Sequence, residues 1–139
     1  MQIFRVHENH QVSAQFLDNR RLSKQVLEMY QIIRVCLGAM DIIETNTRYL
    51  SHPIVKSIYN EGYPYILDAH ALLKELDEEH QRRGGKRSIE FRKDLSALSE
   101  IVEAHKSKFN PEQIPPFFVY GDEKLYGEAV YGRYAQLLF

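Results

Sequence analysis

Apolar residues recur every three or four positions in three long stretches of the chain, a spacing typical of one buried face of an α-helix. The clearest stretch covers residues 20–37, and its apolar line consists of Leu22, Val26, Met29, Ile33 and Cys36 or Leu37. We expect this helix to be capped by Asp18 or Asn19 and to end at Gly38, because side-chain oxygens cap helix starts and glycine favours helix ends.

Two more long helices are predicted from the same spacing. One runs from about Tyr65 to Arg83, where Gly84 and Gly85 end it, and the other begins after Ser88, its expected cap. Their inward positions are Ile66, Ala69, Leu73 and Leu76 in the first, and Phe91, Leu95, Leu98 and Val102 in the second.

Shorter helices are predicted over 12–17 and over 53–59, the second opened by a first-turn proline. Prolines break the pattern after the third long helix, and a loop with an irregular aromatic tail over 117–139 is expected to follow. Alternation of period two is confined to 117–120, so little sheet is expected. The sequence therefore predicts an all-α fold, a single compact domain over residues 1–139 with about three long helices and several short ones.

The composition is that of an ordinary globular domain, because 44% of the 139 residues are hydrophobic and 27% are charged. With 18 Lys and Arg against 19 Asp and Glu, the net charge of -1 argues against nucleic-acid binding through overall charge, so a local basic face is required. The single cysteine, Cys36, is expected to be a small buried residue. No apolar run approaches the roughly 20 residues of a membrane span, and the first residues lack a signal-peptide core, which predicts a cytoplasmic protein.

Polar side chains form a stripe beside the apolar face of the 20–37 helix, at Arg21, Lys24, Gln25 and Glu28. Two interpretations are open. Lys24 and Glu28 have the spacing of a surface ion pair, which stabilises a helix by a few tenths of a kcal/mol. Alternatively, the cations hold phosphates and Glu28 acts as an acid or an electrostatic stabiliser.

A second basic group lies where the next long helix ends, at Arg82, Arg83, Lys86 and Arg87. Its arginines have a structural explanation, because cations at a helix C-terminus stabilise the helix dipole. In the other interpretation, the two glycines between them let the backbone approach a phosphate, while Lys86 and Arg87 supply charge.

The histidines do not predict a metal site. His7 and His10 are the only close pair, and no histidine has HxxxH spacing or a cysteine partner, so no metal or other cofactor is expected. His70 and His80 are expected at the edge of the core, and His105 at a helix end.

Aromatic residues are concentrated in the tail. Tyr126, Tyr131 and Tyr134 are interleaved with glycines and Arg133, a mixture suited to stacking on bases or to packing against a sugar-phosphate backbone. Packing within the core or in a dimer is the alternative.

The segment LDNRRLSKQVLEMYQIIR at residues 17–34, which follows a very short N-terminal segment, resembles the pyrimidine-dimer DNA glycosylase family, the endonuclease V type of DNA-repair lyase. Three further features agree in order: His52 and Pro53 followed by IVKSIY, a long helix ending in basic residues and glycine, and the tail YGEAVYGRY. Together these features cover most of the chain.

The resemblance implies a compact helical enzyme without a metal, whose nucleophile is the N-terminal α-amine. Here that amine is expected on Met1, because Gln2 is too bulky to favour methionine removal. The family's catalytic glutamate lies in a stretch that aligns with residues 20–24, where this chain has none. Glu28 is the expected replacement and Asp18 the reserve.

We therefore expect a DNA glycosylase/AP lyase that excises ultraviolet-induced pyrimidine dimers through a Schiff base of its N-terminal amine and nicks the strand by β-elimination. Its expected partner is double-stranded DNA with damaged pyrimidines, without a membrane or an obligate protein partner, in a nucleoid-associated or phage-infected cytosol. The expected DNA contacts are Arg20, Arg21, Lys24, Gln25, His52, Arg82, Arg83, Lys86, Arg87, Tyr126 and Tyr131. The alternatives are a noncatalytic nucleic-acid- or protein-binding module with the same fold, and a metal-dependent nuclease.

Overall fold

The computed structural model describes residues 3–114, 117–120, 123–126, 132–133 and 135–136. Its α-helices are α1 (His10–Phe16), α2 (Asn19–Ala39), α3 (Pro53–Tyr59), α4 (Ile66–Arg82) and α5 (Ile89–Ala104). Short 3₁₀ helices are η1 (Arg48–Ser51), η2 (Asn60–Gly62) and η3 (Lys106–Lys108). The predicted all-α class, with three long helices and shorter ones around them, is confirmed. None of the helices in the described residues has the length and apolar character needed to span a membrane.

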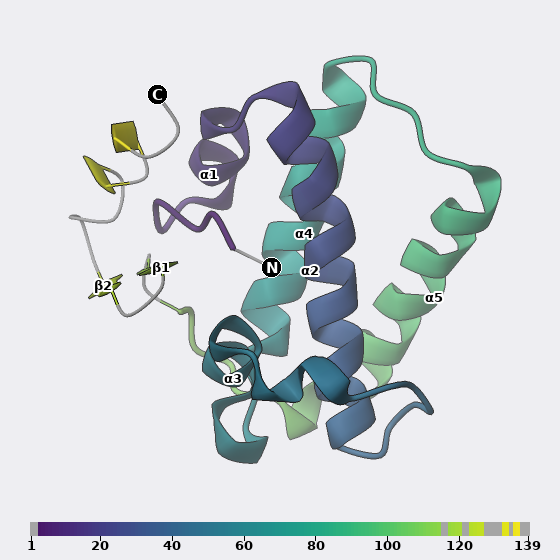
Figure 1. Cartoon of the computed structure of the whole chain (residues 1–139). Coiled ribbons are helices and arrows are strands. Elements are labelled where there is room, and N and C mark those ends of the chain that lie inside the picture. The colour runs from purple at the N-terminus through teal and green to yellow at the C-terminus, as the bar shows by residue number, and fades with distance from the viewer. Residues whose placement is uncertain (1–2, 115–116, 121–122, 127–131, 134, 137–139) are drawn as a thin grey trace.

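The core lies between α2 and α4, which pack side by side at the centre of the molecule with α1 and α3 against them (Figure 1). The predicted apolar lines of both helices are buried, at Leu22, Val26, Met29 and Ile33 on α2 and at Ile66, Ala69, Leu73 and Leu76 on α4. On α5 only the second half of the predicted line is buried. Phe91 and Leu95 are half-buried, and the Phe91 ring meets Tyr30 of α2 edge-on with 5.2 Å between ring centroids.

The predicted starts of α2 and α5 are confirmed by their capping hydrogen bonds, whereas the short helix predicted over 12–17 begins at His10. Asp18 caps α2 by accepting from the backbone N–H of Arg21, and Ser88 caps α5 by accepting from Phe91. Pro53 occupies the first turn of α3, where a backbone N–H would have no hydrogen-bond partner within the helix, so its absence does not weaken the helix.

The predicted end of α2 at Gly38 is wrong, because the helix continues to Ala39. A Cβ on Gly38 would lie 2.5 Å from Cγ2 of Thr45, so the glycine lets the following loop pack on the last helical turn. The same helix carries Cys36, which is buried as expected, and burial raises the pKa of its thiol to about 12.

Part of the tail that was expected to be irregular forms an antiparallel hairpin. Its strands are β1 (Phe117–Tyr120) and β2 (Glu123–Tyr126), paired from Phe117 with Tyr126 to Tyr120 with Glu123. The brief alternation at 117–120 marks β1, but β2 has no such pattern of its own. It becomes a strand only by pairing with its neighbour.

Asp68 of α4 is the centre of a buried polar cluster that joins distant parts of the chain. Its carboxylate accepts from Arg5 Nε at 3.1 Å and from the backbone N–H of Ile114 at 2.9 Å, and it lies 2.8 Å from His10 Nε2. Burial alone would raise the pKa of Asp68, but the His10 hydrogen bond, the Arg5 charge and the Ile114 N–H lower it overall. The carboxylate therefore holds residues 5, 10 and 114 on α4 in its ionised form.

His70 of α4 is buried as well, and its Nε2 lies 3.0 Å from the hydroxyl of Ser99 on α5. That hydroxyl donates to the Leu95 carbonyl, so it accepts from His70. Burial, followed by the nearby Lys74 charge, lowers the pKa of His70 to about 4, although Glu103 partly opposes the shift. The ring is neutral at physiological pH.

Replacing His70 by Gln is expected to weaken the acid dependence of stability. Between pH 6.5 and about 4 the unfolded chain binds a proton at this residue that the folded protein does not, so the free energy of unfolding falls as the pH falls through this window. The contribution is at most roughly 3 kcal/mol. Urea unfolding of both proteins at the two ends of the window measures it. If the free energy of unfolding fell equally in wild type and His70→Gln over this window, His70 would not be the source of the acid dependence.

Candidate active site

The first turn of α2 carries a basic pair of residues next to the helix cap. Arg20 is exposed, whereas Arg21 is half-buried and forms an ion pair with Asp18. The Arg21 backbone N–H is the main cause that lowers the pKa of Asp18, followed by the Arg21 side chain, while slight burial opposes both. Asp18 is therefore engaged in capping α2 and in pairing with Arg21.

Gln25 connects the beginning of the chain to α2. It does not lie on the exposed surface, as the expected DNA contact required, because only 1% of the residue is exposed. Its Oε1 accepts from the backbone N–H of Phe4 at 2.9 Å, and the adjoining Ile3 is buried in the core. Gln25 therefore holds the first described residues against this face of the helix.

Glu28 follows Gln25 by about one helical turn, so the two side chains lie on neighbouring positions of α2. The side chain of Glu28 is 14% exposed, and its Oε1 is 3.7 Å from Nζ of Lys24, whose own side chain is 75% exposed. Residues of the expected polar stripe thus differ in exposure: Lys24 is exposed, whereas the carboxylate of Glu28 is mostly covered. That carboxylate lies one turn from the residue that anchors Phe4.

His52 brings a third segment to this place, because η1 and α3 both pack on α2. The residue caps α3, and its Nδ1 accepts from the backbone N–H of Ile54 at 3.1 Å. Burial lowers the pKa of His52, and the positive charge of the amino terminus lowers it further, while the negative charge of Glu28 opposes both. His52 of α3 is therefore close enough to Glu28 of α2 for the carboxylate to influence the imidazole electrostatically.

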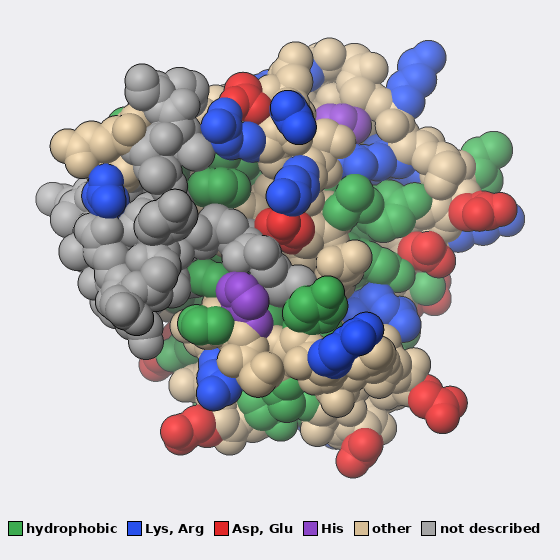
Figure 2. Space-filling view, in the orientation of Figure 1, with side chains coloured by type: hydrophobic (Ala, Val, Ile, Leu, Met, Phe, Trp, Pro, Cys, Tyr) green, Lys and Arg blue, Asp and Glu red, His purple; other side chains and the backbone are tan. Residues whose placement is uncertain are grey.

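Lys and Arg side chains gather near α1 and the N-terminal half of α2 on the face shown in Figure 2. The exposed members in this part of α2 are Arg20 and Lys24. This arrangement supplies the local basic face that the near-neutral overall charge made necessary.

The two arginines at the end of α4 are largely engaged with the protein itself. Glu79 pairs with Arg82 Nη2 at 3.1 Å and with Arg83 Nε at 2.9 Å. Arg83 also donates to the carbonyls of Leu17 and Gln15. Arg83 therefore fastens the end of α4 to the α1–α2 junction, while Arg82, with 47% of its side chain exposed, is more accessible.

The loop from α4 to α5 carries the other two predicted cations. Lys86 is exposed, whereas Arg87 is half-buried and donates to the Ser23 carbonyl of α2 at 2.6 Å. A Cβ on Gly85 would lie 2.2 Å from the His80 ring, so this glycine is needed for packing on the ring. Of the basic segment at 82–87, Arg82 and Lys86 are the more accessible candidates for a phosphate.

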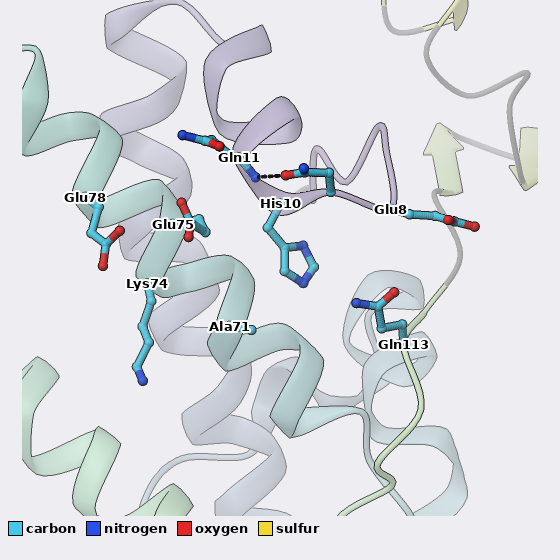
Figure 3. A pocket seen from close by; sticks show the side chains of 9 residues that line it. Glu8, His10, Gln11, Ala71, Lys74, Glu75, Glu78 and Gln113 are labelled. Atoms are coloured by element: carbon cyan, nitrogen blue, oxygen red, sulfur yellow. Dashed lines mark hydrogen bonds between the residues drawn. The ribbon is translucent and has the colours of Figure 1, made fainter.

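A separate hollow of about 380 Å³ lies between the start of α1 and α4 (Figure 3). Its lining includes Glu8, Glu75 and Glu78, with Lys74 beside them. Three carboxylates repel a phosphate backbone, so this hollow does not extend the basic face.

His10, His80 and His105 occupy structural positions. His10 belongs to the Asp68 cluster, His80 packs against Gly85, and His105 Nδ1 lies 2.9 Å from the Ile101 carbonyl at the end of α5. Among the described residues, no group of His, Cys, Asp and Glu side chains has an arrangement that holds a metal.

Three of the predicted site residues are not placed by the structure. Met1 and Tyr131 lie outside the described residues, and of Tyr126 only the backbone, at the end of β2, is described. Their expected functions stay predictions.

A family model described as pyrimidine dimer DNA glycosylase matches residues 1–93, about two thirds of the chain. The chain belongs to the pyrimidine dimer DNA glycosylase family. No curated protein and no solved structure matches it. The region matched by the glycosylase model contains α1 to α4 and the first residues of α5, and thus Glu28, His52 and the basic segment at 82–87.

Sequence reasoning missed one feature of the candidate site and one structural cluster outside it. The anchoring function of Gln25 had a signal, because the residue lies only about 40° from Met29 around the helix and so borders the buried face. The cluster of Arg5, His10 and Asp68 had none, because its members are separated by up to 63 positions in the chain.

Proposed function

We propose that the protein is a DNA glycosylase with AP lyase activity that acts on ultraviolet-induced pyrimidine dimers in double-stranded DNA. Membership of the glycosylase family supports DNA as the substrate. The observation that carries the mechanism is the hydrogen bond from Phe4 N–H to Gln25, which holds the beginning of the chain one turn from Glu28.

The nucleophile in this proposal is the α-amine of Met1. Amines of this kind have a pKa of about 7.7 to 8.0, so a useful neutral fraction exists at physiological pH. The lone pair of the amine attacks C1′ of the damaged nucleotide, the bond from C1′ to the base breaks, and the base accepts the bonding electrons. Opening of the sugar ring then gives a Schiff base.

Glu28 is the proposed carboxylate of the site. Its mostly covered position strengthens its interaction with positive charge on the sugar, because the effective dielectric constant is lower there than in water. It accepts the proton that the amine loses and passes it to the sugar ring oxygen as the ring opens. The ionised carboxylate then helps to remove the C2′ proton, after which the bond from C3′ to oxygen breaks and the strand is nicked.

The exposed cations Arg20, Lys24, Arg82 and Lys86 are the proposed phosphate contacts. They offer point charges to the backbone without base recognition, so they position the duplex and make binding sensitive to salt. The other arginines of these two segments form ion pairs and hydrogen bonds within the protein, namely Arg21, Arg83 and Arg87.

Borohydride trapping tests this proposal on ultraviolet-irradiated duplex, on duplex with an abasic site and on undamaged duplex. We expect a covalent adduct with the first two and none with the third, and peptide mapping is expected to place the adduct at Met1. Acetylation of the N-terminal amine is the matched control and is expected to abolish the adduct. Protein with a free terminal amine that forms no adduct on either damaged duplex would refute the lyase mechanism and favour a noncatalytic binding module.

A further inference from the structure

Helix capping alone does not require a histidine at position 52. Asn, Asp and Ser are the preferred N-cap residues, and they supply the same acceptor with a shorter side chain. Here an imidazole performs the capping with Nδ1, at 3.1 Å from the Ile54 nitrogen, and its second nitrogen is left for another function.

The capping hydrogen bond determines the tautomer of this ring. Because Nδ1 accepts from the backbone, the proton of the neutral imidazole is on Nε2. Pro53 follows directly in the first turn of α3, and the capping hydrogen bond to Ile54 restrains the ring. No hydrogen-bond partner for Nε2 occurs among the described residues. The site therefore contains an N–H donor of known tautomer and restricted orientation.

The charges around His52 keep this donor neutral. Burial and the positive charge of the amino terminus both lower the pKa of His52, and they act against the Glu28 carboxylate. A neutral imidazole donates a hydrogen bond without competing as a cation for Glu28. The two groups therefore have different functions: the carboxylate accepts protons, and the imidazole donates a hydrogen bond.

We propose that His52 donates its Nε2–H to a ring carbonyl oxygen of the pyrimidine whose bond to C1′ is broken. This inference rests on the proposed glycosylase function. When the amine forms its bond to C1′, the electron pair of the broken bond moves onto the pyrimidine and part of the negative charge resides on this oxygen. The amine proton goes to Glu28, His52 keeps its own proton, and the pyrimidine anion is later protonated by water. A fixed donor at the developing anion stabilises the transition state.

The hydrogen bond from His52 is expected to assist release of the pyrimidine but not cleavage at an abasic site. An abasic site has no base, so its cleavage needs the amine and Glu28 but no hydrogen bond to a pyrimidine. His52 is therefore expected to favour intact pyrimidine lesions over abasic sites as substrates.

The test compares His52→Asn with wild type on irradiated duplex and on abasic duplex. Asparagine retains a capping oxygen for α3 but lacks the imidazole N–H. Removal of one such donor is expected to lower the single-turnover rate on irradiated duplex by about 100-fold or more. The ratio of the rate on irradiated duplex to the rate on abasic duplex is expected to fall by at least about tenfold. Ser88→Asn, which also places asparagine at a helix N-cap, that of α5, is the control and should leave this ratio unchanged.

His52→Ser, which also retains a capping oxygen, repeats the comparison if the asparagine variant does not fold. An unchanged rate ratio in a folded variant overturns the inference while the proposed function stands, because wild type still cleaves both substrates. Wild type that cleaves neither substrate overturns both.

Discussion

Replacing Glu28 by Gln is expected to lower cleavage of irradiated duplex by about 100-fold or more, the usual loss when a general acid or base is removed. Glutamine has nearly the same volume and can hydrogen-bond, but it carries no charge and cannot accept the proton of the amine. The contact with Lys24 at 3.7 Å is long and half in solvent, so its loss is expected to change stability by less than about 1 kcal/mol.

Single-turnover cleavage and equilibrium binding to irradiated duplex separate the two functions of this residue. The Glu28→Gln variant is expected to bind the lesion about as well as wild type, because the exposed cations supply the phosphate contacts. Glu78→Gln, an exposed carboxylate on α4, is the matched control and should have wild-type activity. Full activity of Glu28→Gln would exclude Glu28 as the catalytic carboxylate, and loss of both binding and folding would mark it as structural.

Replacing Asp68 by Ala is expected to lower the free energy of unfolding by about 3–5 kcal/mol. The change leaves Arg5, which is 1% exposed, without its carboxylate, and it also removes the partners of His10 and of the Ile114 N–H. Removal of one member of a buried ion pair costs this much because the remaining charge stays desolvated. This is a large share of the roughly 5–15 kcal/mol that stabilises an ordinary domain.

Urea unfolding measures this loss as a lower transition midpoint with an unchanged slope. Asp77→Ala is the matched control on the same helix. It removes an ion pair with Arg92, whose side chain is 34% exposed, and is expected to cost less than about 1 kcal/mol. If Asp68→Ala destabilised the protein no more than Asp77→Ala, the buried cluster would not stabilise the fold.

The candidate site was only partly predictable from the sequence. Helical spacing placed Lys24 and Glu28 together, since both belong to one helix, and the resemblance to the family pointed to Glu28. The same spacing put Gln25 in the polar stripe, but tertiary packing covers that side of α2 with Ile3 and Phe4 and turns Gln25 inward. For Arg83 and Arg87 the sequence showed only charge, while the fold determines that they bond to carbonyls of distant residues.

The sequence by itself determined the three long helices, a cap at Asp18 or Asn19 for α2 and at Ser88 for α5, and the buried lines of α2 and α4. These features depend on residues within a few positions of one another, so local propensity and periodicity are sufficient to predict them. Only the tertiary structure decided that His52 lies near Glu28, and that Asp68 joins Arg5, His10 and Ile114. Such contacts connect residues far apart in the chain, and their geometry depends on how whole helices pack, which no local pattern records.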